Sequence, residues 1–194
     1  YSNLTLHDTL QYAAKLRMPD NTTRKERNSR IKEVLEIVQL TELENSYIRQ
    51  LSGGQRKRAS IAVELIADPN LFFLDEPTSG LDPGTERSIM LTLRKMAEMG
   101  KTVILVTHNT LNLHLCDKVA FFGKGGKLCF FGRPKDALEF FGVDDFVDIY
   151  TLLNEDVGLW YNKFKSIEET VKVEEDIEDK TKIKKKKKSF FRQL

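Results

Sequence analysis

The chain has 194 residues, enough for one domain with a sizeable core, and 40% of them are hydrophobic, as in soluble globular proteins. Its formal net charge of +2 excludes a strong overall field that would attract nucleic acid or a membrane. The two cysteines, Cys116 and Cys129, show neither a metal-ligand spacing nor a disulfide framework. The longest apolar runs are far shorter than a membrane span.

The first part of the chain predicts three helices. The first begins at Thr5, and its expected buried face consists of Leu10, Ala13, Ala14 and Leu16. The second runs from about Arg24 to Leu40. The third follows Ser52, and its expected buried residues are Ala59, Ile61, Ala62, Leu65 and Ile66.

Strands appear next. The apolar run 71–74 predicts a strand that is buried on both faces. A helix from about Thr85 to Met99, ending at Gly100, separates it from a second strand, Thr102–Val106. Strands that alternate with helices predict a parallel α/β sheet.

The last third is more varied. Two short strands flank residues 123–126 as in a hairpin, and Pro134 begins a helix that reaches about Phe141. From Ser166 an acidic block is followed by a basic one, which predicts a solvated linker.

Two acids end the first predicted strand. Asp75 and Glu76 lie at the carboxyl end of an apolar run, where ligands bind in open α/β sheets. Nucleotide hydrolysis needs one carboxylate for Mg²⁺ and another that orients water. Adjacent strand residues point to opposite sides, so Asp75 and Glu76 can divide these tasks. A plain surface turn explains the pair equally well when it is considered alone.

Three other short elements are ambiguous individually. Residues 52–55 form a glycine turn before a helix, where free N–H groups and the helix dipole favour a phosphate. His108 follows the second strand and could reach a terminal phosphate. Residues 79–82 form a turn with glycine and aspartate. Each of these is more often plain structure than a functional site.

Their order and spacing resemble the ATP-binding-cassette ATPase family over about residues 1–143. The resemblance implies a partial P-loop NTPase sheet with a helical subdomain over 1–50, and the signature motif, Walker B strand, D-loop and H-loop over 51–143. Residues 144–165 would be a C-terminal extension, and 166–194 a linker toward a transmembrane domain. The signature motif would consist of Leu51, Ser52, Gly53, Gly54 and Gln55.

The resemblance also implies cofactors and roles. The implied cofactors are ATP and Mg²⁺. Asp75 would bind the metal, Glu76 would act as general base, and His108 would contact the γ-phosphate. In a head-to-tail dimer, the signature motif would face ATP held by the partner domain, and Asp82 would help to join the two halves.

Further features resemble the G, or White-like, subfamily of transporters. They are the run from Leu51 to Arg58 leading into 64–69, the opening 4–17, and the segment 130–141. Two residues depart from that pattern: Gln55 stands where glutamate is usual, and Asn109 and Thr110 follow His108 in place of Gln-Pro.

The phosphate-binding loop of this family is not found in the chain. The only Gly-Lys-Thr is 100–102, but Lys95 occupies the position where such a loop needs glycine, and the helix precedes the triplet. We therefore expect the chain to start just past the Q-loop, to bind MgATP weakly by itself in calorimetric titration, and to leave apolar sheet surface uncovered.

The expected partners are a second nucleotide-binding domain, a transmembrane domain C-terminal in the same protein, and the membrane surface through Lys184–Lys188, at its cytoplasmic face. No nucleic acid is expected. Two alternatives stay open: a soluble cassette ATPase acting on nucleic acid or ribosomes, and a non-catalytic partial domain that donates its signature motif.

Overall fold

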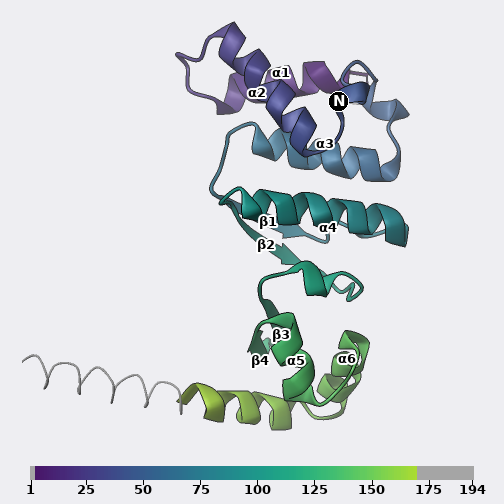
Figure 1. The fold of residues 1–194 in the computed structure, drawn as a ribbon, viewed down its shortest axis with the longest axis vertical. Helices are drawn as coiled ribbons and strands as arrows, with labels where there is room; N and C mark the ends of the chain where they lie inside the picture. Colours follow the sequence, from purple (N-terminus) through teal and green to yellow (C-terminus); the bar gives the residue numbers. More distant parts are fainter. Residues whose placement is uncertain (1–2, 170–194) are drawn as a thin grey trace, which may run out of the picture. The chain divides into compact units, whose positions relative to one another are not determined.

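The computed structural model describes residues 3–169 and divides the chain into two compact units, Tyr1–Leu115 and Cys116–Leu194. The first unit contains three helices followed by a β-α-β segment (Figure 1). The second contains a hairpin and helices. The predicted linker from residue 170 onward, with Lys184–Lys188, lies outside the described residues.

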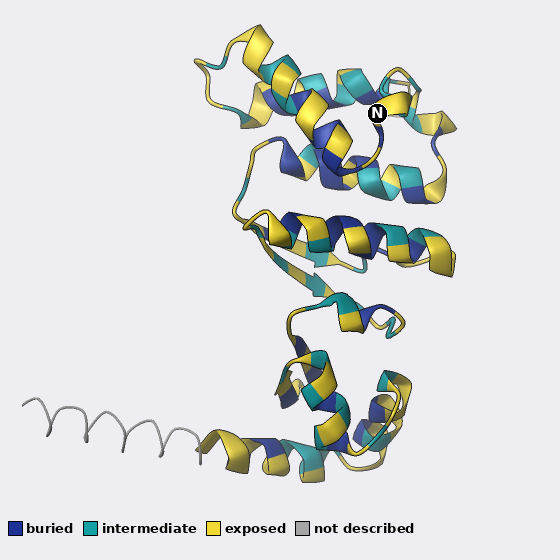
Figure 2. Ribbon diagram, in the orientation of Figure 1, coloured by how far each residue is buried: buried dark blue, intermediate teal, exposed yellow. Residues whose placement is uncertain are grey.

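The three helices of the first unit are α1 (Leu6–Arg17), α2 (Arg24–Ile37) and α3 (Gly53–Leu65). Short 3-10 turns, η1 (Thr41–Leu43) and η2 (Ile48–Gln50), lie between α2 and α3. Figure 2 shows that the buried residues of α1, α2 and α3 lie mainly where these helices pack together. The five residues expected to be buried near the end of the third helix are all buried.

Two details of these helices differ from the prediction. Leu16 is 85% exposed, because at 100° per residue it lies about 100° from the centre of the face formed by Leu6, Leu10, Ala13 and Ala14. The second helix ends at Ile37 and not at Leu40, because Gln39 adopts a left-handed conformation with φ 58°. The amide of Leu40 then donates to the Leu35 carbonyl at 2.9 Å, which closes a Schellman-type helix end.

The first sheet has two parallel strands, β1 (Leu71–Asp75) and β2 (Thr102–Val106), joined through α4 (Pro83–Glu98). Its register pairs Phe73 with Ile104 and Asp75 with Val106. Gly100 follows α4 with φ 86°, as expected for the residue that ends this helix. The parallel pair and its helical crossover confirm the predicted β-α-β order.

The prediction that the first strand is buried on both faces is wrong. Phe72 is 4% exposed, whereas its neighbour Phe73 is 71% exposed. Ile104 and Val106, on the same face as Phe73, are exposed as well. Successive side chains point to opposite faces, and within residues 3–169 only one face of this two-stranded sheet is covered. The other face is the uncovered apolar surface that the sequence predicted.

The 3-10 turn η3 (Leu113–Leu115) ends the first unit. The second unit begins at Cys116 and contains an antiparallel hairpin, β3 (Val119–Gly123) and β4 (Lys127–Gly132). Helices α5 (Pro134–Phe141) and α6 (Phe146–Glu155) follow, and residues 157–169 are also helical. The hairpin and α5 match the prediction, while the first four residues of the predicted linker, 166–169, belong to a helix. Aromatic rings form the core of this unit: Phe121, Phe130, Phe140, Phe141, Trp160 and Phe164.

Candidate nucleotide site

The carboxyl ends of β1 and β2 bring Glu76 and His108 together. The amide of Glu76 donates to the Val106 carbonyl at 2.9 Å, which continues the strand pairing by one residue. Glu76 has φ 46°, a left-handed conformation that non-glycine residues rarely adopt. This turn directs the Glu76 side chain toward the neighbouring strand end.

One carboxylate oxygen of Glu76 holds His108 through two contacts. The Glu76 Oε1 atom accepts from the His108 backbone amide at 3.1 Å, and it lies 2.7 Å from His108 Nδ1. The His108 side chain is 77% exposed, while that of Glu76 is 32% exposed. The ring is therefore fixed through Nδ1, and its other nitrogen remains available to a ligand in solvent.

Asp75 lies on the other side of this strand end. It is exposed, and strand alternation places it on the same face as Phe73. The two adjacent acids therefore occupy different environments, with Glu76 bonded to His108 and Asp75 on the open sheet face.

The signature segment forms a capped helix start. Ser52 is the N-cap of α3, and its hydroxyl oxygen accepts from the Gln55 amide at 3.2 Å. The Gln55 side chain accepts in turn from the Ser52 amide at 2.8 Å. This reciprocal capping box gives Gln55 a structural role that the sequence analysis missed, although Ser-x-x-Gln before an apolar run is its recognised pattern.

The two signature glycines have different surroundings. Gly53 is exposed, whereas Gly54 is buried against α4, where an added Cβ would lie 2.2 Å from Thr85 Cγ2. Leu51, just before the cap, is 3% exposed and belongs to the core. Ser52 and Gly53 are therefore the two exposed residues of the signature segment, Gln55 is half-buried, and close packing against Thr85 favours glycine at position 54.

Asp82 begins the helix α4. Its carboxylate accepts from the Thr85 amide at 3.0 Å, and the adjacent Pro83 occupies the first helical turn. Hydrogen bonds from the Thr85 side chain and backbone lower the pKa of Asp82 below its ordinary value. In this chain Asp82 is a helix cap, and Leu81 before it lies 3.6 Å from where a Gly53 Cβ would be.

Lys57 connects α3 to the strand end. Its Nζ atom donates to the Glu76 carbonyl at 3.3 Å. The contact places the second turn of α3 beside the acidic pair of the same chain.

Three residues near the site were missed from the sequence. Glu86 on α4 is 2% exposed, and its carboxylate accepts from the side-chain amides of Asn109 and Asn112. Asn109 had been noted only as a departure after His108. The available signal was a glutamate on the buried face of an amphipathic helix, which requires a polar partner.

Comparison with known proteins identifies a family. Residues 2–79 match the family model described as "ABC transporter". The chain is 41% identical over 156 residues to an "ABC transporter ATP-binding/permease protein" of Mycobacterium tuberculosis, covering 80% of this chain and 18% of that protein. It is 42% identical over 148 residues to "ABC transporter G family member 22" of Arabidopsis thaliana, covering 73% of this chain and 20% of the relative.

A solved structure gives the same fold. It is cbiO1 from Clostridium perfringens, described as part of the ABC transporter complex cbiONQ, with a TM-score of 0.63 and 32% sequence identity. The match covers 72% of this chain and 54% of that one. The fold is thus the α/β fold of an ATP-binding-cassette ATPase, a P-loop NTPase, as predicted.

The chain belongs to the ATP-binding-cassette transporter family, and its relatives include White-like, G-subfamily members. It spans 10–23% of the length of the curated relatives compared with it.

The exposed groups at the strand ends suit a magnesium nucleotide. Mg²⁺ is held through one or two carboxylates, substrate phosphates and several waters, so the single exposed Asp75 fits that donor set. Within residues 3–169, no three or more histidine, cysteine or acidic side chains are grouped so that they could hold a metal ion. The exposed Ser52 and Gly53 at a helix start fit a phosphate.

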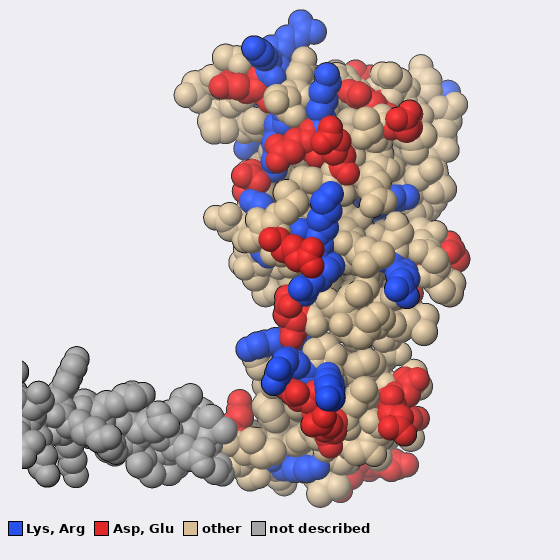
Figure 3. All heavy atoms as spheres, viewed as in Figure 1, with Lys and Arg blue, Asp and Glu red and all other residues tan. Residues whose placement is uncertain are grey.

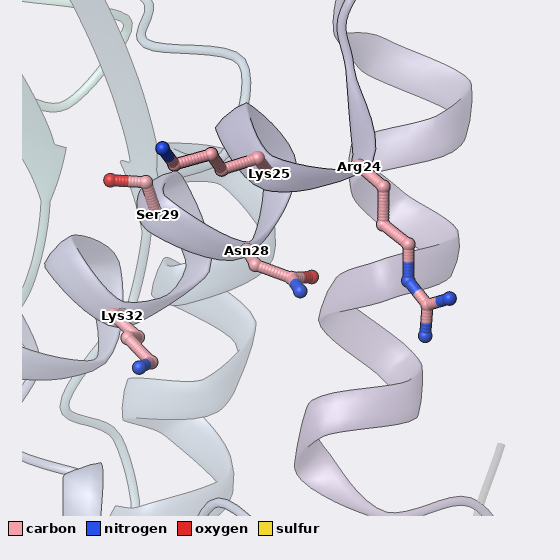
Figure 4. A pocket seen from close by; sticks show the side chains of 5 residues that line it. All are labelled: Arg24, Lys25, Asn28, Ser29 and Lys32. Carbon is pink, nitrogen blue, oxygen red and sulfur yellow. The ribbon is translucent and has the colours of Figure 1, made fainter.

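Other surface features do not compete with this site. A hollow of about 560 Å³ is lined by five residues that all come from α2: Arg24, Lys25, Asn28, Ser29 and Lys32 (Figure 4). Because one helix supplies every side chain, no opposing group converges on a ligand there. Figure 3 shows basic and acidic side chains interspersed on the visible face. None of the helices in residues 3–169 has the length and apolar character that a membrane crossing requires.

Proposed function

We propose that this chain is the signature-bearing part of an ATP-hydrolysing domain in an ATP-binding-cassette transporter. The observation that carries the proposal is the contact between Glu76 and His108 at the tips of two paired parallel strands. In open α/β sheets, ligands bind at this edge. The family match over residues 2–79 supports ATP with Mg²⁺ as the ligand.

The residues divide the chemistry of hydrolysis among them. Glu76 acts as general base and orients the attacking water, with its left-handed backbone setting the direction of the carboxylate. His108 is fixed through Nδ1 and offers Nε2 to the γ-phosphate. Asp75 holds the metal, and Mg²⁺ would supply charge neutralisation for the phosphates.

The signature segment acts on a second nucleotide-binding domain. Ser52 and Gly53 are exposed at the start of α3, where backbone N–H groups and the helix dipole favour the γ-phosphate of ATP held by the partner domain. Leu51, Gly54 and Gln55 support this start by packing and capping. Asp82, at the start of α4, keeps the adjoining turn in place beside Gly53.

Closure of the head-to-tail dimer around ATP drives transport, in the direction of export, through a transmembrane domain that is C-terminal in the same protein. The nucleotide domain then lies at the cytoplasmic face, with the Lys184–Lys188 run near anionic lipid. This arrangement follows the G-subfamily relatives, whose names describe transporters.

The test is Glu76→Gln in the full-length protein. Loss of a general base lowers turnover by roughly 10²–10⁴-fold, while ATP binding persists and the closed dimer accumulates. Glu98→Gln is the matched control, because Glu98 is an exposed carboxylate on α4 that forms an ion pair with its helical neighbour Arg94. Unchanged ATP turnover in Glu76→Gln, with nucleotide binding intact, contradicts the proposed role.

A further inference from the structure

Glu86 is a buried carboxylate that ties α4 to the segment after His108. The residue is 2% exposed. Its Oε1 atom accepts from Asn112 Nδ2 at 2.9 Å, and its Oε2 atom accepts from Asn109 Nδ2. Each carboxylate oxygen thus binds one amide donor, and both donors come from the same short segment of chain.

Asn109 uses both ends of its side chain. Its Nδ2 atom donates to Glu86, while its Oδ1 atom accepts from the Leu111 amide at 3.1 Å. The backbone amide of Asn109 donates to Thr107 Oγ1 at 3.0 Å. The residues on both sides of His108 are therefore held by the bonds of Asn109, and Glu86 connects this arrangement to α4.

Two carboxylates therefore hold His108 and the segment that follows it. Glu76, at the end of β1, accepts from its ring and its backbone amide. Glu86 holds the next residue, Asn109, from the side of α4. Asp82, the cap of α4, precedes Glu86 by one helical turn, so the helix start and the histidine segment share one rigid element.

Burial of a carboxylate carries a cost in free energy. Amide donors offset part of that cost. An apolar residue at this position would avoid the desolvation cost altogether if packing were the only requirement. Among the described hydrogen bonds of Glu86, both go to the segment that follows His108. The directed arrangement therefore indicates a positioning task.

We propose that Glu86 is a positioning residue for His108, holding residues 107–112 so that the ring and amide of His108 both reach Glu76. The importance of this positioning for ATP hydrolysis rests on the proposed function. The positioning itself is a property of this chain and can be tested without nucleotide. The expected signature is the tautomer of the His108 ring, since Nδ1–H donates to Glu76 in the positioned state.

The experiment records ring nitrogen and proton NMR spectra of the 194-residue chain over a pH series and reads the tautomer where the histidine signals no longer change as the pH rises. Substitution of His7 and His114 in turn assigns the His108 signals. We expect the Nδ1–H tautomer in the unmodified chain. In Glu86→Gln, one of the two amide donors loses its acceptor, so the His108 ring should shift toward the Nε2–H tautomer of a free imidazole. Its backbone amide should exchange with solvent roughly tenfold faster.

A rescue variant separates positioning from general loss of structure. In Glu86→Gln combined with Asn109→Asp, the new amide at 86 can donate to the new carboxylate at 109 and still accept from Asn112. The donor and acceptor complement is thereby restored, and the Nδ1–H tautomer should return. Asn109→Ala removes the hydrogen bond to Glu86 by changing the donor residue, and it replaces Glu86→Gln in the experiment if that variant does not fold. Glu98→Gln on the exposed face of α4 is the control and should leave the ring unchanged.

An unchanged tautomer and unchanged exchange at His108 in folded Glu86→Gln, or in folded Asn109→Ala, overturns the inference. Failure of the double variant to restore the tautomer overturns it as well. None of these results depends on ATP turnover, so the proposed function can fail with the positioning intact, and the reverse also holds.

Discussion

The close approach of α3 to α4 predicts opposite fates for the two signature glycines. A methyl group on Gly54 would lie 2.2 Å from Thr85 Cγ2, far inside an ordinary contact. A methyl group on Gly53 would meet Leu81 Cδ2 at 3.6 Å, an ordinary contact. Neither glycine has a positive φ, so alanine is compatible with the backbone at both positions.

The magnitude follows from two opposing effects. An extra methyl group in a filled site costs about 1–3 kcal/mol, whereas replacing glycine by alanine in a helix returns at most about 1 kcal/mol. Gly54→Ala should therefore lower the free energy of unfolding by about 1–2 kcal/mol. Gly53→Ala should be neutral or stabilise by up to about 1 kcal/mol.

Urea denaturation followed by circular dichroism measures both changes. Thr85→Ser supplies the rescue, because it removes the clashing Cγ2 and keeps the hydroxyl group. In the Thr85→Ser background, Gly54→Ala should cost less than in the unmodified chain, and the difference is the coupling energy. Equal stability of the two alanine variants, or absence of coupling with Thr85, would refute the packing argument.

Three further predictions concern capping, titration and burial. Ser52→Ala should destabilise the chain by about 1 kcal/mol in urea denaturation, because the Gln55 amide loses its cap acceptor. A hydrogen bond from Lys101 lowers the pKa of Asp68, so its contribution to stability is present above the unfolded pKa and disappears as pH falls through the folded one. In Asp68→Asn the free energy of unfolding should accordingly fall less steeply as the pH is lowered. Phe72→Ala should lower the free energy of unfolding by about 3–5 kcal/mol in urea denaturation. Phe73→Ala should lower it much less, since Phe72 is buried and Phe73 is exposed.

The sequence was sufficient for most of the elements and for the locations of the acidic pair. Capping residues, apolar spacing and the glycine at position 100 act within a few residues of one another, so their effect is visible in the chain itself. The family resemblance was also visible there, because the spacing of its motifs is a property of the chain. The roles assigned to the individual site residues stay predictions until the variants above are measured.

Other features depended on contacts between distant residues. A continuous apolar run predicted burial on both faces of β1, but exposure depends on which elements cover each face, and Phe73 is open. The close packing of Gly54 on Thr85, more than thirty positions along the chain, was likewise not visible, and the phosphate contact of Gly54 stays a prediction. Such approaches cannot be read from local sequence.

The sequence by itself determined the helices up to α5, the strand order and the family of this protein, because each depends on local patterns or motif spacing. The helices over 146–155 and 157–169 were not predicted. Only the tertiary structure decided that Glu76 holds His108 through one oxygen, and that Glu86 holds the segment after it. The physical reason is that these hydrogen bonds join residues brought together by the parallel pairing of β1 with β2 and by the position of α4.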